Sequence, residues 1–261
     1  MAKSVNRSGD AAYVLHSHDW SESSLILELL TRDHGRVVAV AKGAKRPYSQ
    51  LRPVLMPFQR LNVAFGAKRS EDAEVWLLRH AEWAGGEAWP GGAAFLPGFY
   101  LNELLIRLTA RHDPHPALFD AYAQTLQAMR EPALLQAALR AFELLLLREL
   151  GHLPDLSVET VTHHGVASDR VYEIHPQLGI LPGHEGDEDA GSSAIHGANL
   201  IQIEQALDSS IAPKHTVIPA LMAACVPVLS ELKSILRALI HYHLGSQTLR
   251  TRQLMMELQQ S

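Results

Sequence analysis

The chain has 261 residues, 47% of them hydrophobic, 20% charged and 6% aromatic, with a formal net charge of −5. That length and composition are typical of a globular protein with one large or two modest domains, and they exclude a fibrous or wholly disordered chain. The single cysteine, Cys225, excludes an internal disulfide framework and a multi-cysteine zinc site, and we expect a buried, inert thiol.

The first residues contain no apolar segment of the kind that directs secretion. The apolar stretch at 215–230 contains Pro219 and Pro227 and is shorter than the ~20 residues that cross a bilayer. We therefore expect a soluble, cytoplasmic protein that does not bind a membrane.

Residues 1–84 predict a small all-β domain. Five short apolar segments follow one another without helical periodicity, and the turn Arg32-Asp33-His34-Gly35 separates the second from the third. The loop at 43–57 contains three prolines, which remove hydrogen-bond donors and disfavour a central strand. Five strands without intervening helices favour a closed or nearly closed β-barrel. The expected strands are 12–16, 25–31, 36–41, 60–65 and 73–80.

Glycine pairs at 85–86 and 91–92 mark a domain boundary, and beyond them the hydrophobic period becomes helical. We therefore expect a mainly α-helical domain over 85–261, so that the whole chain is an α+β multidomain protein. Its central core helix is predicted at 133–150, where apolar residues cover about half the surface. The segment 152–197 has six histidines and an acidic run, and we expect an irregular insertion with a hairpin near 171–181.

The charge of the chain is unevenly distributed. Residues 1–83 have 12 Lys and Arg against 9 Asp and Glu, hence +3, whereas the other 178 residues have 11 against 19, hence −8. Within the first part, the window 32–69 has nine cations and one acid, Asp33. Such a block is either a solvated surface or a track for a polyanion, since each phosphate that a cation neutralises releases counterions and adds affinity.

The sequence VAVAKGAKRPYSQLRP at 38–53 favours the second alternative. A strand ends at Lys42, Gly43 allows a sharp turn, and Lys45 and Arg46 follow on a loop with Tyr48. Cationic loops with exposed aromatic rings bind single-stranded nucleic acid on small barrels, although a flexible basic hairpin would have the same composition. The predicted DNA-binding residues are Arg36, Lys42, Lys45, Arg46, Tyr48, Arg52, Arg60, Lys68 and Arg69.

Aromatic residues divide by their surroundings. Trp20 and Tyr48 lie in polar stretches and are candidates for base stacking. Trp76 and Trp83 lie in or just after an apolar strand, and we expect them to pack in the core. The 15 histidines show no metal-binding spacing, and the common catalytic and phosphate-binding motifs are absent. We expect a binding protein with no catalytic residues, metal or cofactor; the alternatives are an RNA-binding barrel of cold-shock type or a histidine-based metallohydrolase.

Several separate motifs, in order along the chain, resemble the RecO family of bacterial DNA repair proteins. They are AYVLHSHDWSESSLILELLTRDHGRVVAVAKGAKR at 12–46, MPFQRL at 56–61, FYLNELLIRL at 99–108, LRAFELLLLRELGHLPDL at 139–156 and LGSQTLRTRQLM at 244–255. The resemblance implies an N-terminal OB-fold followed by a helical domain, in a nucleoid-associated recombination mediator. It also implies that Lys42, Lys45 and Arg46 contact DNA, because KGAKR matches the basic stretch of the family.

The family resemblance further implies binding of single- and double-stranded DNA, annealing of complementary strands, and loading of RecA, with the partner RecR, on DNA coated by single-strand binding protein (SSB). Many members have a four-cysteine zinc site, but the matching stretch here, SVETVTHHGVASD at 157–169, has no cysteine. We therefore expect no zinc and a more loosely held segment at 157–197. We also hypothesise that Arg140 receives the acidic, apolar C-terminal tail of SSB, the alternative being a surface arginine whose stem covers apolar neighbours.

Overall fold

The computed structural model describes residues 9–66, 74–85, 92–183, 194–208, 217–245 and 248–260. The chain divides into two compact units, Met1–Phe119 and Asp120–Ser261. The glycine pairs predicted as a boundary fall between the last barrel strand and the first helix, and residues 86–91 lie outside the described part. The first unit therefore contains the barrel together with helix α1, and helix α2 crosses the division.

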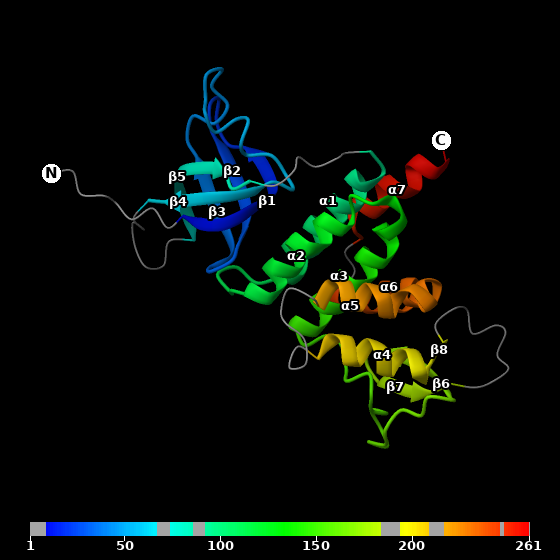
Figure 1. Ribbon diagram of the computed structural model, residues 1–261. Helices are drawn as coiled ribbons and strands as arrows, with labels where there is room; N and C mark the ends of the chain where they lie inside the picture. Colours follow the sequence, from blue (N-terminus) through cyan, green and yellow to red (C-terminus); the bar gives the residue numbers. More distant parts are fainter. Residues whose placement is uncertain are drawn as a thin grey trace. The chain divides into compact units, whose positions relative to one another are not determined.

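Five strands close into a barrel in the order β1-β2-β3-β5-β4, with β3 and β5 parallel and the other neighbours antiparallel (Figure 1). This is the strand order of an OB-like barrel, so the predicted fold class is confirmed. Strand β1 extends beyond the predicted 12–16 because it pairs with β2 as far as Asp19, through a bulge after Val14. The strands are β1 (Asp10–Asp19), β2 (Leu25–Thr31), β3 (Gly35–Ala41), β4 (Arg60–Phe65) and β5 (Val75–Trp83).

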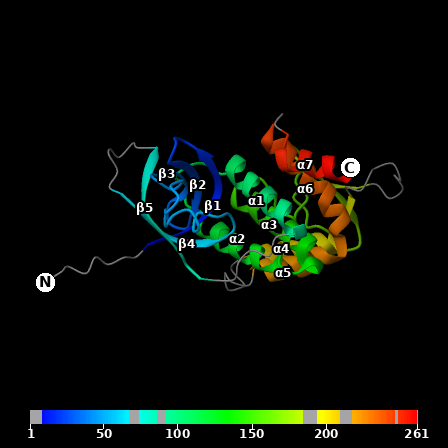
Figure 2. The ribbon, with the colours of Figure 1, turned by 90° about the horizontal axis from the view of Figure 1, so that it is seen from above.

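Small and branched side chains fill the inside of the barrel, around which the strands curve in Figures 1 and 2. Inward residues alternate along each strand, as the pleat of a sheet requires. The members include Leu27 and Leu29 from β2, Val37 from β3 and Leu61 from β4, all 0% exposed. Their burial explains why the strongly apolar β2 and β3 sequences form strands here.

Helix α1 (Phe95–Leu108) packs against β1 within the first unit, where the buried Asn102 side chain donates to the Leu15 carbonyl at 2.9 Å. After the helix, the chain passes along β3, and the His112 amide donates to the Arg36 carbonyl. Gly35 has a φ of +66° there, and a Cβ at this position would lie 2.0 Å from the Asp113 carbonyl oxygen. Only glycine allows this approach.

The second unit is built around α3 (Leu135–Glu149), which is buried without interruption from residue 137 to 147. It packs against α5 and α6, confirming the predicted central core helix. The predicted hairpin is also confirmed, as strands β6 and β7 of a three-stranded sheet in the order β7-β6-β8. The elements are α2 (Pro116–Ala128), β6 (Val171–His175), β7 (Gly179–Pro182), β8 (Ala194–His196), α4 (Gly197–Leu207), α5 (Val217–Cys225), α6 (Leu229–Leu244) and α7 (Arg250–Gln260).

The insertion predicted at 152–197 therefore contains regular structure, although residues 184–193 lie outside the described part. Hydrogen bonds to the buried Glu159 side chain hold its first half: Thr162 donates to one oxygen and the Tyr172 hydroxyl to the other. Cys225 is buried as expected, and burial raises the pKa of its thiol to about 12.

One helical stretch, Val217–Leu244, is long and apolar enough to cross a membrane by length and composition alone. Its apolar side chains include Leu221, Leu232 and Leu236, which are at most 1% exposed within the second unit. Core helices of soluble proteins have the same composition, so this stretch is weak support for a membrane span.

Candidate nucleic-acid interface

The loop between β3 and β4, residues 42–59, carries the basic motif, and we refer to it as the basic loop. It is anchored at several points, because Ala44 and Leu55 are buried in the barrel core and Leu51 and Val54 pack against that core. Gly43 has a φ of +71°, which confirms the predicted sharp turn after the strand. The anchored side chains give the loop a fixed course, unlike a flexible hairpin.

A second anchor lies at the end of the basic loop. Phe58 of the MPFQRL motif has a φ of +67°, unusual for a residue other than glycine, and its side chain is 7% exposed. Its ring packs edge-on against Phe99 and Phe95 of α1, with centroids 5.1 and 5.9 Å apart. Burial of the ring compensates for the strained backbone, so Phe58 fixes where the loop meets α1.

Lys45 links the basic loop to the turn between β1 and β2. Its amide donates to the Ser23 carbonyl at 3.0 Å, and its ammonium group donates to the Ser21 carbonyl at 3.3 Å and the Asp19 carboxylate at 2.8 Å. Because three bonds join the two segments, they lie side by side at the upper end of the barrel in Figure 1. Lys45 therefore positions the loop in addition to carrying charge.

Three further cations of the basic loop, Lys42, Arg46 and Arg52, are exposed. Within the described residues none of these three, which we call the loop cations, forms an ion pair. Pro47 follows Arg46 in a turn closed by the Ser49 amide donating to the Arg46 carbonyl at 3.0 Å. A proline at this position favours such a turn, and the next residue, Tyr48, is 94% exposed. The loop thus presents uncompensated positive charge and an exposed ring.

Arg36, by contrast, takes part in packing on the outside of the barrel. Its side chain is 11% exposed and lies 2.9 Å from the Glu28 carboxylate, and it also donates to the Thr109 carbonyl. Arg111 contacts the other oxygen of Glu28 at 2.9 Å. The geometry therefore gives Arg36 a structural role, and we leave it out of the interface. Leu30 pairs with Arg36, so the hairpin register already places Glu28 diagonally opposite that residue.

Arg60 lies apart from the loop cations. Arg60 pairs with Tyr13 in the sheet, six residues before the end of β1, or roughly 20 Å along the strand from Asp19. Its guanidinium lies 6.0 Å from the centre of the Phe119 ring. Lys68 and Arg69 lie outside the described residues.

Arg140 is not the surface arginine that was the alternative to a contact with the SSB tail. It lies on α3 with its side chain 10% exposed, 2.8 Å from the carboxylate of Glu143, which is 1% exposed. Both charges act on the pKa of the Cys225 thiol on α5, which Arg140 lowers and Glu143 raises. The two residues therefore form an ion pair inside the second unit. The sequence predicted an apolar surface over only half of α3, so it did not indicate that this pair is buried.

The structure shows whether the four aromatic side chains are exposed or buried, and it leaves base stacking by Trp20 and Tyr48 a prediction. Trp20 is 64% and Tyr48 94% exposed, and Trp76 is buried at 8%. Trp83 was expected in the core, but it is 55% exposed because it lies at the end of β5. Among the described residues, no three His, Cys, Asp or Glu side chains gather as metal ligands.

Comparison with known proteins decides the family. The model described as "Recombination protein O N terminal" matches residues 6–82, and "Recombination protein O C terminal" matches residues 93–253. This chain belongs to the RecO family of DNA repair proteins. A relative from Polaromonas sp. (strain JS666), named DNA repair protein RecO, is 49% identical over 98% of both chains.

Two further RecO relatives are each 50% identical to this chain over 254 residues. The match to the relative from Polaromonas naphthalenivorans covers 97% of each chain. The match to the relative from Albidiferax ferrireducens covers 97% of this chain and 96% of the relative. The RecO N-terminal match covers the barrel strands up to residue 82 and the basic loop, so the candidate interface lies within the part of the chain that this family model matches. Membership supports a role in DNA repair and recombination.

Proposed function

We propose that this protein is a recombination mediator that binds single- and double-stranded DNA through the basic loop and anneals complementary strands. With RecR, it would promote RecA loading on DNA coated by SSB. The observation that carries the DNA-binding part is the set of loop cations on an anchored loop of a RecO-family barrel. They are exposed, and they form no ion pair with any residue that the structure describes. RecR, RecA and SSB are inferred from family membership.

The proposed mechanism is electrostatic and needs no bond to be made or broken. Two DNA strands repel each other, and each phosphate that meets a loop cation loses part of its charge and releases counterions. A second strand then approaches a partly neutralised first strand at lower cost. Base pairing itself reads the sequence, so contacts to the backbone suffice, and the protein is not an enzyme.

The acidic second unit would limit indiscriminate binding, since residues 120–261 have 9 Lys and Arg against 16 Asp and Glu, hence −7. The SSB tail remains a proposed partner, with Arg140 as its predicted contact. Because Arg140 is paired with Glu143, its part in tail binding has to be separated from its part in folding. We propose that the protein works in the cytoplasm, at the nucleoid.

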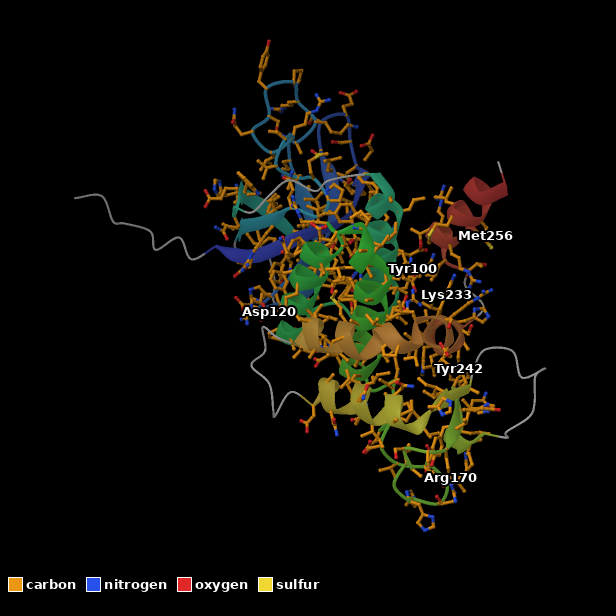
Figure 3. All side chains as sticks on the ribbon, turned by 45° about the vertical axis from the view of Figure 1, so that its right-hand side comes forward. Tyr100, Asp120, Arg170, Lys233, Tyr242 and Met256 are labelled. Carbon is orange, nitrogen blue, oxygen red and sulfur yellow. The ribbon has the colours of Figure 1, made fainter. Side chains whose placement is uncertain are left out.

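The test is annealing of complementary oligonucleotides coated with SSB. A variant with Lys42→Ala, Arg46→Ala and Arg52→Ala removes the loop cations but keeps Lys45 and its bonds. The control removes three exposed cations from the second unit, Arg170→Ala, Lys233→Ala and Arg237→Ala (Figure 3 labels the first two).

We expect the loop variant to lose most of the annealing rate and the control to retain it. Equal rates in the loop variant and the wild type would refute the basic loop as the DNA site. A wild-type protein that binds the strands without annealing them would refute the mediator role.

A further inference from the structure

We propose that Trp20 and Tyr48 are base-stacking residues that make the interface prefer single-stranded DNA over a duplex. The inference rests on the proposed function and adds a specificity-determining pair to it. The loop cations attract any phosphate backbone, single or double, and so cannot by themselves distinguish the two. Discrimination requires groups that recognise what only a single strand exposes, which is the face of an unpaired base.

Both rings are exposed at this end of the barrel. Trp20 is 64% exposed and Tyr48 94% exposed, and within the described residues neither has an aromatic or hydrogen-bonding partner for its side chain. Large aromatic rings are normally at least partly buried, so leaving both in water forgoes burial that would stabilise the fold.

Backbone hydrogen bonds fix the two turns that carry the rings. The Trp20 amide donates to the Ser24 carbonyl at 3.1 Å, which closes the β1–β2 turn. Tyr48 follows Pro47 in the turn closed by Ser49. The two turns are joined by Lys45, so the rings project from segments with a fixed relation to each other and to the loop cations.

This arrangement also suits annealing. A base stacked on a ring is held by its face, and the edge that forms Watson–Crick pairs stays available to a second strand. Every base has such a face, so the pair would favour single strands without favouring a sequence. The cations then hold the backbone while the aromatic rings hold the bases apart.

An abasic strand separates the two contributions, because it keeps the phosphates and lacks the bases. Binding of labelled oligothymidylate, an abasic strand of equal length and a duplex is measured for the wild type and for Trp20→Ala with Tyr48→Ala. The control is Trp83→Ala, which removes a tryptophan of similar exposure from the end of β5. Trp20→Phe, which keeps a ring, tests rescue.

We expect the wild type to bind oligothymidylate more tightly than the abasic strand, by about 5- to 150-fold for each stacked base. The double variant should lose that preference and keep its affinity for the abasic strand and the duplex, while the control retains it and Trp20→Phe restores part of it. A double variant that keeps the preference, or weakens on all three probes equally, would overturn the stacking role. A wild type that binds none of the probes would instead refute DNA binding itself.

Discussion

Replacing Arg140 by alanine tests the buried ion pair of α3. The variant removes the guanidinium that lies 2.8 Å from the Glu143 carboxylate, and the Glu143 side chain is 1% exposed. Removing one member of a buried pair typically costs ~3–5 kcal/mol, because the remaining charge is desolvated and uncompensated.

That loss would be a large part of the ~5–15 kcal/mol that stabilises a typical domain. Urea unfolding followed by helical circular dichroism measures it, with Arg140→Met combined with Glu143→Leu as the control. The double variant replaces both charges by apolar side chains of similar size and should recover most of the stability. A loss below about 1 kcal/mol for Arg140→Ala would refute a large contribution of this buried ion pair to stability.

The same double variant separates folding from partner binding. If Arg140 contacts the SSB tail, the folded double variant should bind a peptide of that tail more weakly than the wild type. If it binds the peptide equally well, the role of Arg140 is confined to the ion pair, and the cation that receives the tail lies elsewhere.

Three further predictions concern other features. Asp19→Asn removes the carboxylate that competes with phosphate for Lys45, so titration should show DNA affinity raised by about 1.5- to 5-fold; unchanged affinity would mean that this pair stays closed on DNA. Gly35→Ala should lower the free energy of unfolding by more than ~1–2 kcal/mol, because its positive φ adds to a backbone clash. Burial, and then the charge of His152, lower the pKa of His243 below its ordinary value of 6.5. Below pH 6.5 the unfolded chain therefore binds more protons than the folded chain, and the free energy of unfolding should fall as the pH drops. His243→Gln should reduce this pH dependence.

The barrel and the basic loop were predictable from the sequence because their signals are local. Strand-length apolar runs, the turn before Gly35 and the prolines of the loop each restrict nearby backbone. The roles of particular cations could not be predicted in this way, because they depend on contacts with residues from other segments. Arg36 is neutralised by Glu28 from the adjacent strand, and Lys45 is bonded to residues of the β1–β2 turn, so a window of positive charge overstated the free charge.

In the second unit, the pattern of α3 indicated an apolar face covering half the helix. The structure buries every residue from 137 to 147, which brings Arg140 and Glu143 inside as a pair. The i,i+3 spacing of those two residues was visible in the sequence, but the burial that gives the pair its importance depends on how α5 and α6 cover the helix. The prediction that Trp83 packs in the core was wrong for the opposite reason. Its strand ends where the core ends, so its side chain is exposed.

The most direct test of the account is the salt dependence of single-stranded DNA binding. The logarithm of the association constant is plotted against the logarithm of salt concentration for the wild type, the variant lacking the loop cations, and the control lacking Arg170, Lys233 and Arg237. If each loop cation neutralises one phosphate, the slope of the loop variant should be shallower by about 2, and the control should keep the wild-type slope. Identical slopes for the loop variant and the wild type would contradict the claim that this loop binds the DNA backbone.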